Sequence, residues 1–320
     1  MKSLWQNDLP LMLGLTAICL LVISCVGGEQ LPWSYYQNYG FSSVTFTDDM
    51  NCNPVWSPDG KRIAFSSDRD GSFDLWLVEA RPGNQQPVQV TSGFGDDQHP
   101  AWSPDGRRLS FTRWLPGGLG NIYVCPAEEN GGTQARCLLE ADSLRQYSDP
   151  AYDLAGNLYC VEEDLYWNGS RLVRITEDNS TECLFLGLAF VWHPKPTEHG
   201  VVLSAMVKGN MTPSIWLFDP EREITKPLLA DSLGCWLGTL SPDGRYLAYN
   251  ARVGGSMKIV VRDLQQNTVQ YLPCLFGAPE GASWSPCGKH LCFVDRLNEG
   301  QINVFVYTFL SEKGEPRALN

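Results

Sequence analysis

Acidic and aromatic residues gather in a few polar segments, where they could bind a ligand. Asp48 and Asp49 are adjacent, as are Asp96 and Asp97, and such carboxylate pairs can supply oxygen ligands to calcium. Trp114 and Trp167 lie in Gly-containing polar segments, where an indole gives up apolar burial unless it packs back or contacts a partner. The chemistry these residues offer is cation binding, sugar stacking or the anchoring of a protein.

The familiar catalytic and metal-binding signatures are missing from the sequence. The chain has four His. It contains neither the Gly-x-Ser-x-Gly motif of hydrolases nor the His-Glu-x-x-His motif of zinc peptidases. It also contains no Gly-rich loop that would bind a nucleotide phosphate, and no Cys-x-x-Cys pair that would mark a zinc or redox site. We therefore expect a binding protein with no catalytic residues and no zinc. Calcium is the one cofactor left open.

Composition and charge narrow the class of partner. The formal charge is −12, from 24 Lys and Arg against 36 Asp and Glu, and phosphate neutralisation needs a concentrated basic surface. Nucleic acid is therefore excluded, and a basic or neutral partner fits better. With 43% hydrophobic residues, 30 Gly and 21 Pro, the chain can build a packed core with many tight turns.

The first 25 residues have the pattern of an export signal. Residues 9–23 are apolar apart from Thr16 and are followed by Ser24 and Cys25; the stretch is shorter than the ~20 residues that span a bilayer as a helix. Residues 22–25, Val-Ile-Ser-Cys, resemble a bacterial lipobox, which implies cleavage after residue 24 and a lipid on Cys25. We expect an exported, membrane-tethered lipoprotein, periplasmic or at the cell surface; an ordinary signal peptide or an uncleaved anchor stays open.

An internal repeat is the strongest signal in the sequence. Four segments share an aromatic or Leu residue followed by Ser-Pro-Asp-Gly or Ser-Pro-Cys-Gly: residues 53–61, 99–107, 239–245 and 283–289. Two further copies are degenerate, at residues 149–156 and 190–194. The anchors of the six copies are Trp56, Trp102, Tyr152, Trp192, Leu240 and Trp284. They are 46, 50, 40, 48 and 44 residues apart. Six units of this period fit a propeller.

Each unit reads as four short strands. Pro-Asp-Gly between two extended segments is a hairpin turn, in which Pro fixes φ, Asp bonds the backbone and Gly takes the left-handed conformation. We predict an all-β, six-bladed β-propeller over residues 41–310, after a linker at 25–40 and before a polar tail at 311–320. Residues 43–47 should close the ring by pairing with the third strand of the last blade, near 302–309, which hides the sheet edges.

The repeat resembles the WD40-like (PD40) repeat of TolB and tricorn-type propellers, over about residues 41–310. We expect the additional domain that precedes the propeller in TolB to be absent, because only about fifteen residues separate the leader from the first strand. The resemblance implies a protein-interaction module of the cell envelope that binds a protein or peptide. The alternative is a propeller that binds or degrades a polysaccharide, with calcium as its ion.

Propellers usually bind ligands on the face made by loops that enter the innermost strands and loops that join the second and third strands. Six residues are predicted to gather there on two adjacent blades: Asp97, His99, Trp114, Tyr147, Asp149 and Trp167. The other histidines, His193, His199 and His290, are expected in or beside hairpin turns on the opposite face. The recurring Trp and turn Asp residues are expected to be structural.

A disulfide is predicted between Cys125 and Cys137. The two flank a Glu-Asn-Gly-Gly segment at residues 129–132, which would place them opposite each other across a hairpin and within bonding distance.

Overall fold

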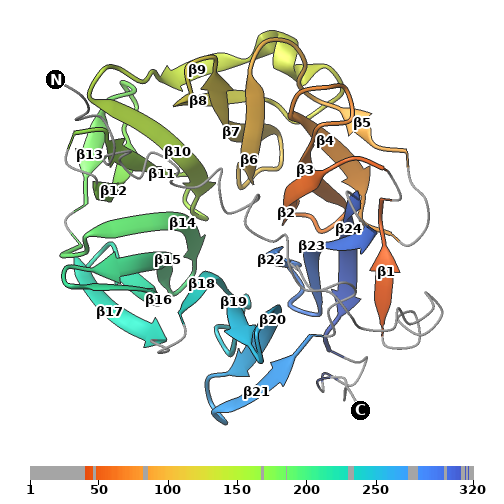
Figure 1. Ribbon diagram of the computed structural model, residues 1–320. Coiled ribbons are helices and arrows are strands. Elements are labelled where there is room, and N and C mark those ends of the chain that lie inside the picture. The colour runs from red at the N-terminus through yellow and green to blue at the C-terminus, as the bar shows by residue number, and fades with distance from the viewer. Residues whose placement is uncertain are drawn as a thin grey trace, which may run out of the picture. The chain divides into compact units, whose positions relative to one another are not determined.

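The computed structural model describes residues 40–45, 48–81, 86–166, 169–184, 186–229, 234–272, 280–298, 301–310, 314 and 316. Residues 1–39, with the predicted leader, Cys25 and the linker, lie outside the described residues. The described part belongs to the compact unit Leu31–Asn320 and is an all-β ring of six four-stranded sheets (Figure 1). The predicted six-bladed β-propeller is confirmed.

Each blade is an antiparallel sheet, and blades 1 to 5 use four strands that follow one another along the chain. Blade 1 comprises β2 (Asn51–Trp56), β3 (Arg62–Ser67), β4 (Asp74–Glu79) and β5 (Val88–Gln89). Blade 2 comprises β6 (Asp96–Trp102), β7 (Arg108–Leu115), β8 (Leu119–Pro126) and β9 (Arg136–Leu139), with the 3₁₀ turn η1 (Gly131–Gln134) before β9. Blade 3 comprises β10 (Arg145–Tyr152), β11 (Leu158–Asp164), β12 (Gly169–Ile175) and β13 (Thr181–Cys183). Blade 4 comprises β14 (Phe190–Thr197), β15 (Gly200–Val207), β16 (Asn210–Asp219) and β17 (Ile224–Leu229). Blade 5 comprises β18 (Cys235–Leu240), β19 (Tyr246–Val253), β20 (Ser256–Asp263) and β21 (Thr268–Tyr271).

Blade 6 closes the ring with strands from both ends of the chain. Its order is β22 (Glu280–Trp284), β23 (His290–Asn298), β24 (Gln301–Thr308) and β1 (Phe41–Ser43); β1 and β24 lie side by side in Figure 1. The predicted closure is confirmed, but the strand begins earlier than the predicted residues 43–47. Phe41 pairs with Tyr307 and Ser43 with Phe305, and the Val44 N–H donates to the Val304 carbonyl at 2.9 Å.

The two ends of the ring are built differently. We call the end where first and second strands are joined the turn face, and the end where second and third strands are joined and each blade leads into the next the loop face. On the turn face, Asp59 accepts hydrogen bonds from the Ser57 hydroxyl at 2.6 Å and the Lys61 N–H at 3.1 Å. Ser103-Asp105 and Ser241-Asp243 repeat this arrangement. The turn aspartates are therefore structural, as predicted.

The repeated Trp residues join neighbouring blades. Trp56, Trp102 and Trp284 are buried. The Trp102 Nε1–H donates to the Val55 carbonyl and that of Trp284 to the Thr239 carbonyl, both at 3.2 Å. Trp102 and Trp284 thus bond the innermost strand of the preceding blade, and the core is divided among the blade interfaces.

Blade 4 corrects the predicted alignment of the repeat. In blade 4, Pro196 pairs with Val201 just as Trp56 pairs with Ile63 in blade 1. Pro196 is therefore the equivalent of Trp56. The anchor at Trp192 was therefore wrong by four residues. The error arose because Trp192 precedes a His-Pro dipeptide, whereas Trp102 follows one.

The structure also contradicts the predicted disulfide. Cys125 and Cys137 are free thiols; Cys125 pairs with Leu109, and Cys137 pairs with Tyr123. The connection between β8 and β9, which contains the 3₁₀ turn η1, sets a register in which Cys137 lies opposite Tyr123 and not Cys125, and symmetry about the turn could not foresee it. In the part of the chain that the structure describes, no helix is long and apolar enough to cross a membrane.

Candidate functional site: the central channel and the loop face

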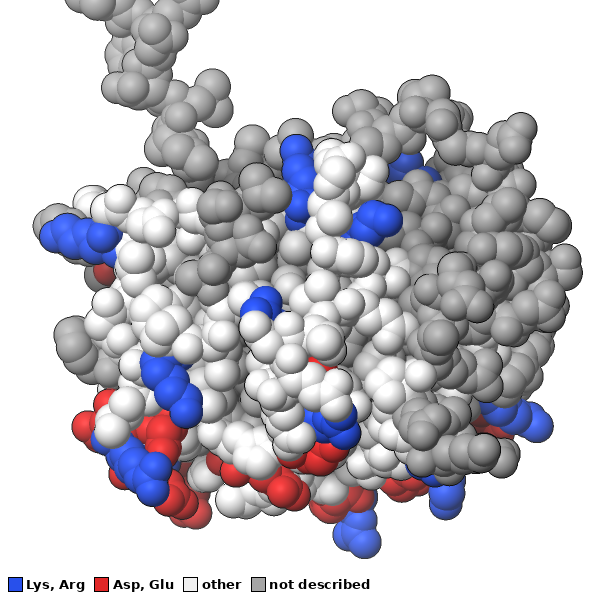
Figure 2. Space-filling model, turned by 90° about the horizontal axis from the view of Figure 1, so that it is seen from below, with Lys and Arg blue, Asp and Glu red and all other residues white. Residues whose placement is uncertain are grey.

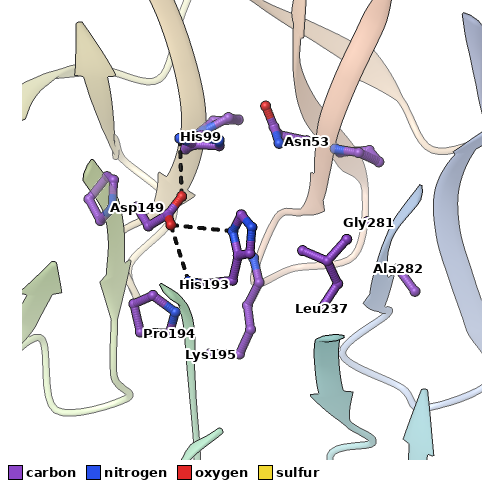
Figure 3. A pocket seen from close by; sticks show the side chains of 12 residues that line it. Asn53, His99, Asp149, His193, Pro194, Lys195, Leu237, Gly281 and Ala282 are labelled. Atoms are coloured by element: carbon purple, nitrogen blue, oxygen red, sulfur yellow. Dashed lines mark hydrogen bonds and ion pairs between the residues drawn. The ribbon is translucent and has the colours of Figure 1, made fainter. Parts of the chain in front are cut away.

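Six bulges line the centre of the ring. In every innermost strand the register shifts by a two-residue β-bulge, and the first residue of each bulge has a positive φ: Asn53, His99, Asp149, His193, Leu237 and Gly281. The left-handed conformation costs a residue other than Gly about 1–2 kcal/mol, and Asn, Asp and His tolerate it best. Because all six blades share it, the bulge is a feature of the ring. It brings these six residues to the lining of one central channel (Figure 3).

Three of these six residues form a His-Asp-His cluster. Asp149 of β10 lies between His99 of β6 and His193 of β14: its Oδ1 is 3.1 Å from His99 Nδ1, and its Oδ2 is 3.3 Å from His193 Nδ1. The His193 backbone N–H also donates to Asp149 Oδ2 at 3.1 Å. One carboxylate therefore orients two imidazoles from the blades on either side (Figure 3).

Burial and charge act in opposite directions on this cluster. Burial by itself raises the pKa of Asp149, but His193, His99 and the hydrogen bonds from His193 lower that pKa well below its ordinary value. Burial also lowers the pKa of His99, against the attraction of Asp149. Asp149 is therefore a fixed anion at neutral pH, and His99 is held toward its neutral form.

Lys195 follows the bulge of β14 and also lines the channel. Burial lowers the pKa of its ammonium group, and the negative charge of Asp149 opposes this. Figure 3 shows its side chain running beside His193 toward the middle of the channel, with Leu237 across from it. The cavity is about 40 Å³, enough for a few waters or a small ion.

The predicted binding residues divide between the channel and the protein interior. His99 and Asp149 lie in the channel, but Asp97 and Tyr147 are 1% and 7% exposed. Asp97 accepts two hydrogen bonds from Arg113, both at 2.7 Å, and Tyr147 packs with the core between blades 2 and 3. The expectation that these two side chains form part of an accessible surface was therefore wrong.

The two predicted Trp anchors differ in what the structure describes. Trp114 of β7 is half-buried, its six-membered ring lies against Gly120, and its Nε1 is buried. Trp167 lies outside the described residues. Trp114 thus packs back onto its own blade. This is the first of the two roles expected for an indole in a polar loop, the other being contact with a partner.

Sequence reasoning placed His193 on the turn face, whereas it lies in the channel beside Asp149. The missed signal is the dipeptide His193-Pro194, which repeats His99-Pro100 and Asp149-Pro150. Aligning the copies on the residue before Pro, rather than on the aromatic residue, would have placed all three in equivalent bulges.

The loop face carries exposed apolar side chains that sequence reasoning also missed. We call Phe94, Leu144 and Tyr166, which are 75%, 48% and 77% exposed, the loop-face patch. Phe94 precedes β6, Leu144 precedes β10 and Tyr166 follows β11, so all three belong to the loops of blades 2 and 3. The Leu165 N–H donates to the Leu144 carbonyl at 2.9 Å, which holds two of these loops together.

Charged side chains concentrate at the ends of the ring. On the flank seen in Figure 2, Asp and Glu gather along the lower edge with Lys and Arg among them, and the middle of the flank is largely uncharged. The loop face near the patch carries exposed Asp70, Glu140 and Asp142. Two arginines of this region are bonded to buried carboxylates: Arg113 to Asp97, and Arg171 to Glu162.

Comparison with known proteins agrees with this architecture. Residues 39–156 match the family described as "PD40: TolB beta propeller domain"; this part of the chain carries TolB-type propeller repeats. No curated protein matches the sequence.

Three solved structures illustrate the range of similar folds. TolB from Acinetobacter baumannii is 17% identical, with a TM-score of 0.59 over 87% of this chain and 65% of its own, so this chain spans about two thirds of that protein. Oligogalacturonate lyase from Vibrio parahaemolyticus is 16% identical, with a TM-score of 0.59 over 86% of this chain and 94% of its own. Tricorn protease is 17% identical, with a TM-score of 0.59 over 85% of this chain and 27% of its own. These likenesses establish the propeller fold, and a fold shared by such different proteins does not fix a function.

Proposed function

We propose that this protein is a protein-binding module whose loop-face patch takes a basic, partly apolar segment of its partner. The observation that carries the proposal is the exposure of Phe94, Leu144 and Tyr166 on adjacent blades of one face. Exposed aromatic and aliphatic side chains that cluster, with polar residues around them, typically mark interaction sites.

Contacts beneath the patch support a rigid binding surface. Gly95, next to Phe94, lies against the backbone carbonyl of Trp114, and Gly120 lies against the Tyr147 carbonyl. The loops of blade 2 therefore pack on each other and on blade 3. A preformed surface loses little conformational entropy on binding.

The surrounding charge favours a basic partner. Asp70, Glu140 and Asp142 are exposed, while the nearby arginines, Arg113, Arg145 and Arg171, lie beside the buried carboxylates Asp97 and Glu162. Carboxylates at the rim of an interface increase the association rate of a positively charged segment.

The proposal includes a membrane tether. It rests on the apolar leader and on the lipobox-like residues 22–25, and it would hold the propeller at the cell envelope through a lipid on Cys25. Replacing Cys25 with Ala should abolish labelling by a fatty-acid analogue and release the protein from the membrane fraction. An unprocessed, membrane-bound Cys25→Ala protein would instead indicate a transmembrane anchor.

A polysaccharide-binding or polysaccharide-degrading propeller with calcium is the less favoured alternative. This alternative needs the indoles of Trp114 and Trp167 as platforms on which sugar rings stack. The Trp114 indole, however, is half-buried against Gly120. A rise in melting temperature with calcium, together with retention on an immobilised polysaccharide, would favour this alternative.

The test compares two faces of the same protein. Full-length Tyr166→Ser, Leu144→Ser and Phe94→Ser proteins are cross-linked to envelope proteins and compared with Leu154→Ser, whose side chain is 68% exposed in the β10–β11 turn of the turn face. Each patch substitution should weaken capture of the same partner by about tenfold or more, and the control should leave it unchanged. Equal capture by all four variants would exclude the patch as the binding site.

A further inference from the structure

The channel contains a cation without a carboxylate of its own. The negative charge of Asp149 acts on Lys195, yet the two oxygens of Asp149 face His99 and His193. Among the described residues, no carboxylate oxygen lies within 4 Å of the Lys195 ammonium group, although ten such ion pairs occur elsewhere in them. Lys195 is half-buried, and a partly desolvated charge without a partner is costly. A ligand of opposite charge would remove that cost.

The groups around this ammonium group are mostly hydrogen-bond donors. An ammonium group offers three N–H donors and no acceptor, and the Asn53 amide offers two more. His193 turns Nδ1 toward Asp149, so its Nε2 remains for the channel. Figure 3 shows Asn53, His193 and Lys195 around the same opening. This set suits an anion better than a metal cation, which the ammonium charge would repel.

We propose that the central channel binds a small carboxylate ion, with Lys195 as its charge partner and the Asn53 amide as an additional donor. A carboxylate is planar and compact, which suits a cavity of about 40 Å³. The site lies on the ring axis and is separate from the loop-face patch, so it does not depend on the proposed protein binding.

Acetate titration of the full-length protein tests the site. Chemical shifts of the imidazole ¹H–¹⁵N groups should move saturably with sodium acetate and should not move with acetamide or with sodium chloride at equal ionic strength. Lys195→Met should weaken acetate binding about tenfold or more, the value of a charge-assisted hydrogen bond. Lys208→Met, which alters an exposed lysine of the same blade, should not.

Several outcomes would reject the site: no saturable shift in the parent protein, an equal shift with acetamide, or undiminished acetate binding by Lys195→Met. If Lys195→Met does not fold, Lys195→Gln supplies the same comparison. A short peptide with a free C-terminus, tested beside its amidated form, distinguishes a partner's terminal carboxylate from a free small acid. If neither the peptide nor acetate binds, the proposal is wrong.

Discussion

The two faces of the ring use their carboxylates in opposite ways. On the turn face, the hydrogen bonds from the Ser57 hydroxyl and the Lys61 N–H lower the pKa of Asp59. At the loop-face end of β4, burial, and then the charge of Asp97, raise the pKa of Asp74 to about 6. The turn-face acid completes a local turn, whereas the loop-face acid is held in a desolvated site beside another carboxylate.

Apolar exposure differs between the faces in the same sense. Leu154 and Ile224 are exposed at the turn-face end, whereas three side chains, Phe94, Leu144 and Tyr166, are exposed in the loop-face connections of two adjacent blades. Locally unfavourable features that collect on one face of an otherwise consistent scaffold indicate function there. The comparison indicates that the repeat motif specifies the scaffold, whereas the connections between the motifs carry the features that differ from blade to blade.

Both faces depend on a closed ring, so opening it should have the largest effect. A chain that begins at Asp48 lacks β1 and loses Phe41 and Val44, which are both buried. It should expose the edge of β24 and melt far below a chain that begins at Gln30, or aggregate. Thermal unfolding and light scattering measure the difference. Equal stability of the two chains would contradict the closure.

Blade 2 offers a matched pair of tryptophans, one near each face. Trp102→Ala empties a buried position and breaks its bond to Val55, so it should lower the free energy of unfolding by about 3–5 kcal/mol. Trp114→Ala removes a half-buried ring and should cost clearly less. Denaturant unfolding of both variants measures this, and equal losses would remove the distinction between the two ends of the blade.

A single turn on the turn face can be weakened without touching the loop face. Ser103 accepts the Arg108 N–H at 3.0 Å and donates to Asp105. Ser103→Ala should cost about 1 kcal/mol of unfolding free energy and leave partner capture unchanged. Ser92→Ala, at an exposed position of a loop-face connection, serves as the control for stability. Reduced capture by Ser103→Ala would show that the faces are coupled.

The smallest effect concerns pH. The pKa of Asp74 is raised to about 6 from an ordinary value of 3.8, so its contribution to stability is complete below about pH 4 and is lost as the pH rises through 6. Asp74→Asn should therefore gain stability relative to the parent protein as the pH rises from 4 to 7. Asp59→Asn should show the opposite trend over the acid range, because the pKa of Asp59 is lowered. Melting temperatures across this range test both signs.

Much of the fold could be predicted because its signals are local. Pro-Asp-Gly followed by an apolar strand specifies a hairpin wherever it occurs, and six copies at a regular period require a ring. The first blade shows this in full: the predicted turn at residues 57–61 is present, with its serine and aspartate bonded as expected. The closing strand was also predicted, although it begins at Phe41.

The site was predicted only in part, because it depends on register and on contacts between blades. His99 and Asp149 were assigned to one site from their positions where the chain enters an innermost strand, but His193 was missed because a shifted alignment placed it in a turn. The β8–β9 connection likewise places Cys137 opposite Tyr123 and not Cys125. A shift of one residue in register turns a side chain to the other face of a sheet, and no local motif reports that shift.

The sequence by itself determined the ring and its turns, since both follow from patterns within about fifty residues, and it indicated the closure, because a strand segment precedes the first complete repeat. Only the tertiary structure decided which polar side chains remain accessible. Asp97 and Tyr147 look like loop-face ligands in sequence, yet blade packing buries both. His193 and Lys195, from a degenerate repeat, reach the channel because all six innermost strands bulge at the same height. Burial and convergence of this kind arise from distant segments packing together, which is why local sequence cannot encode them.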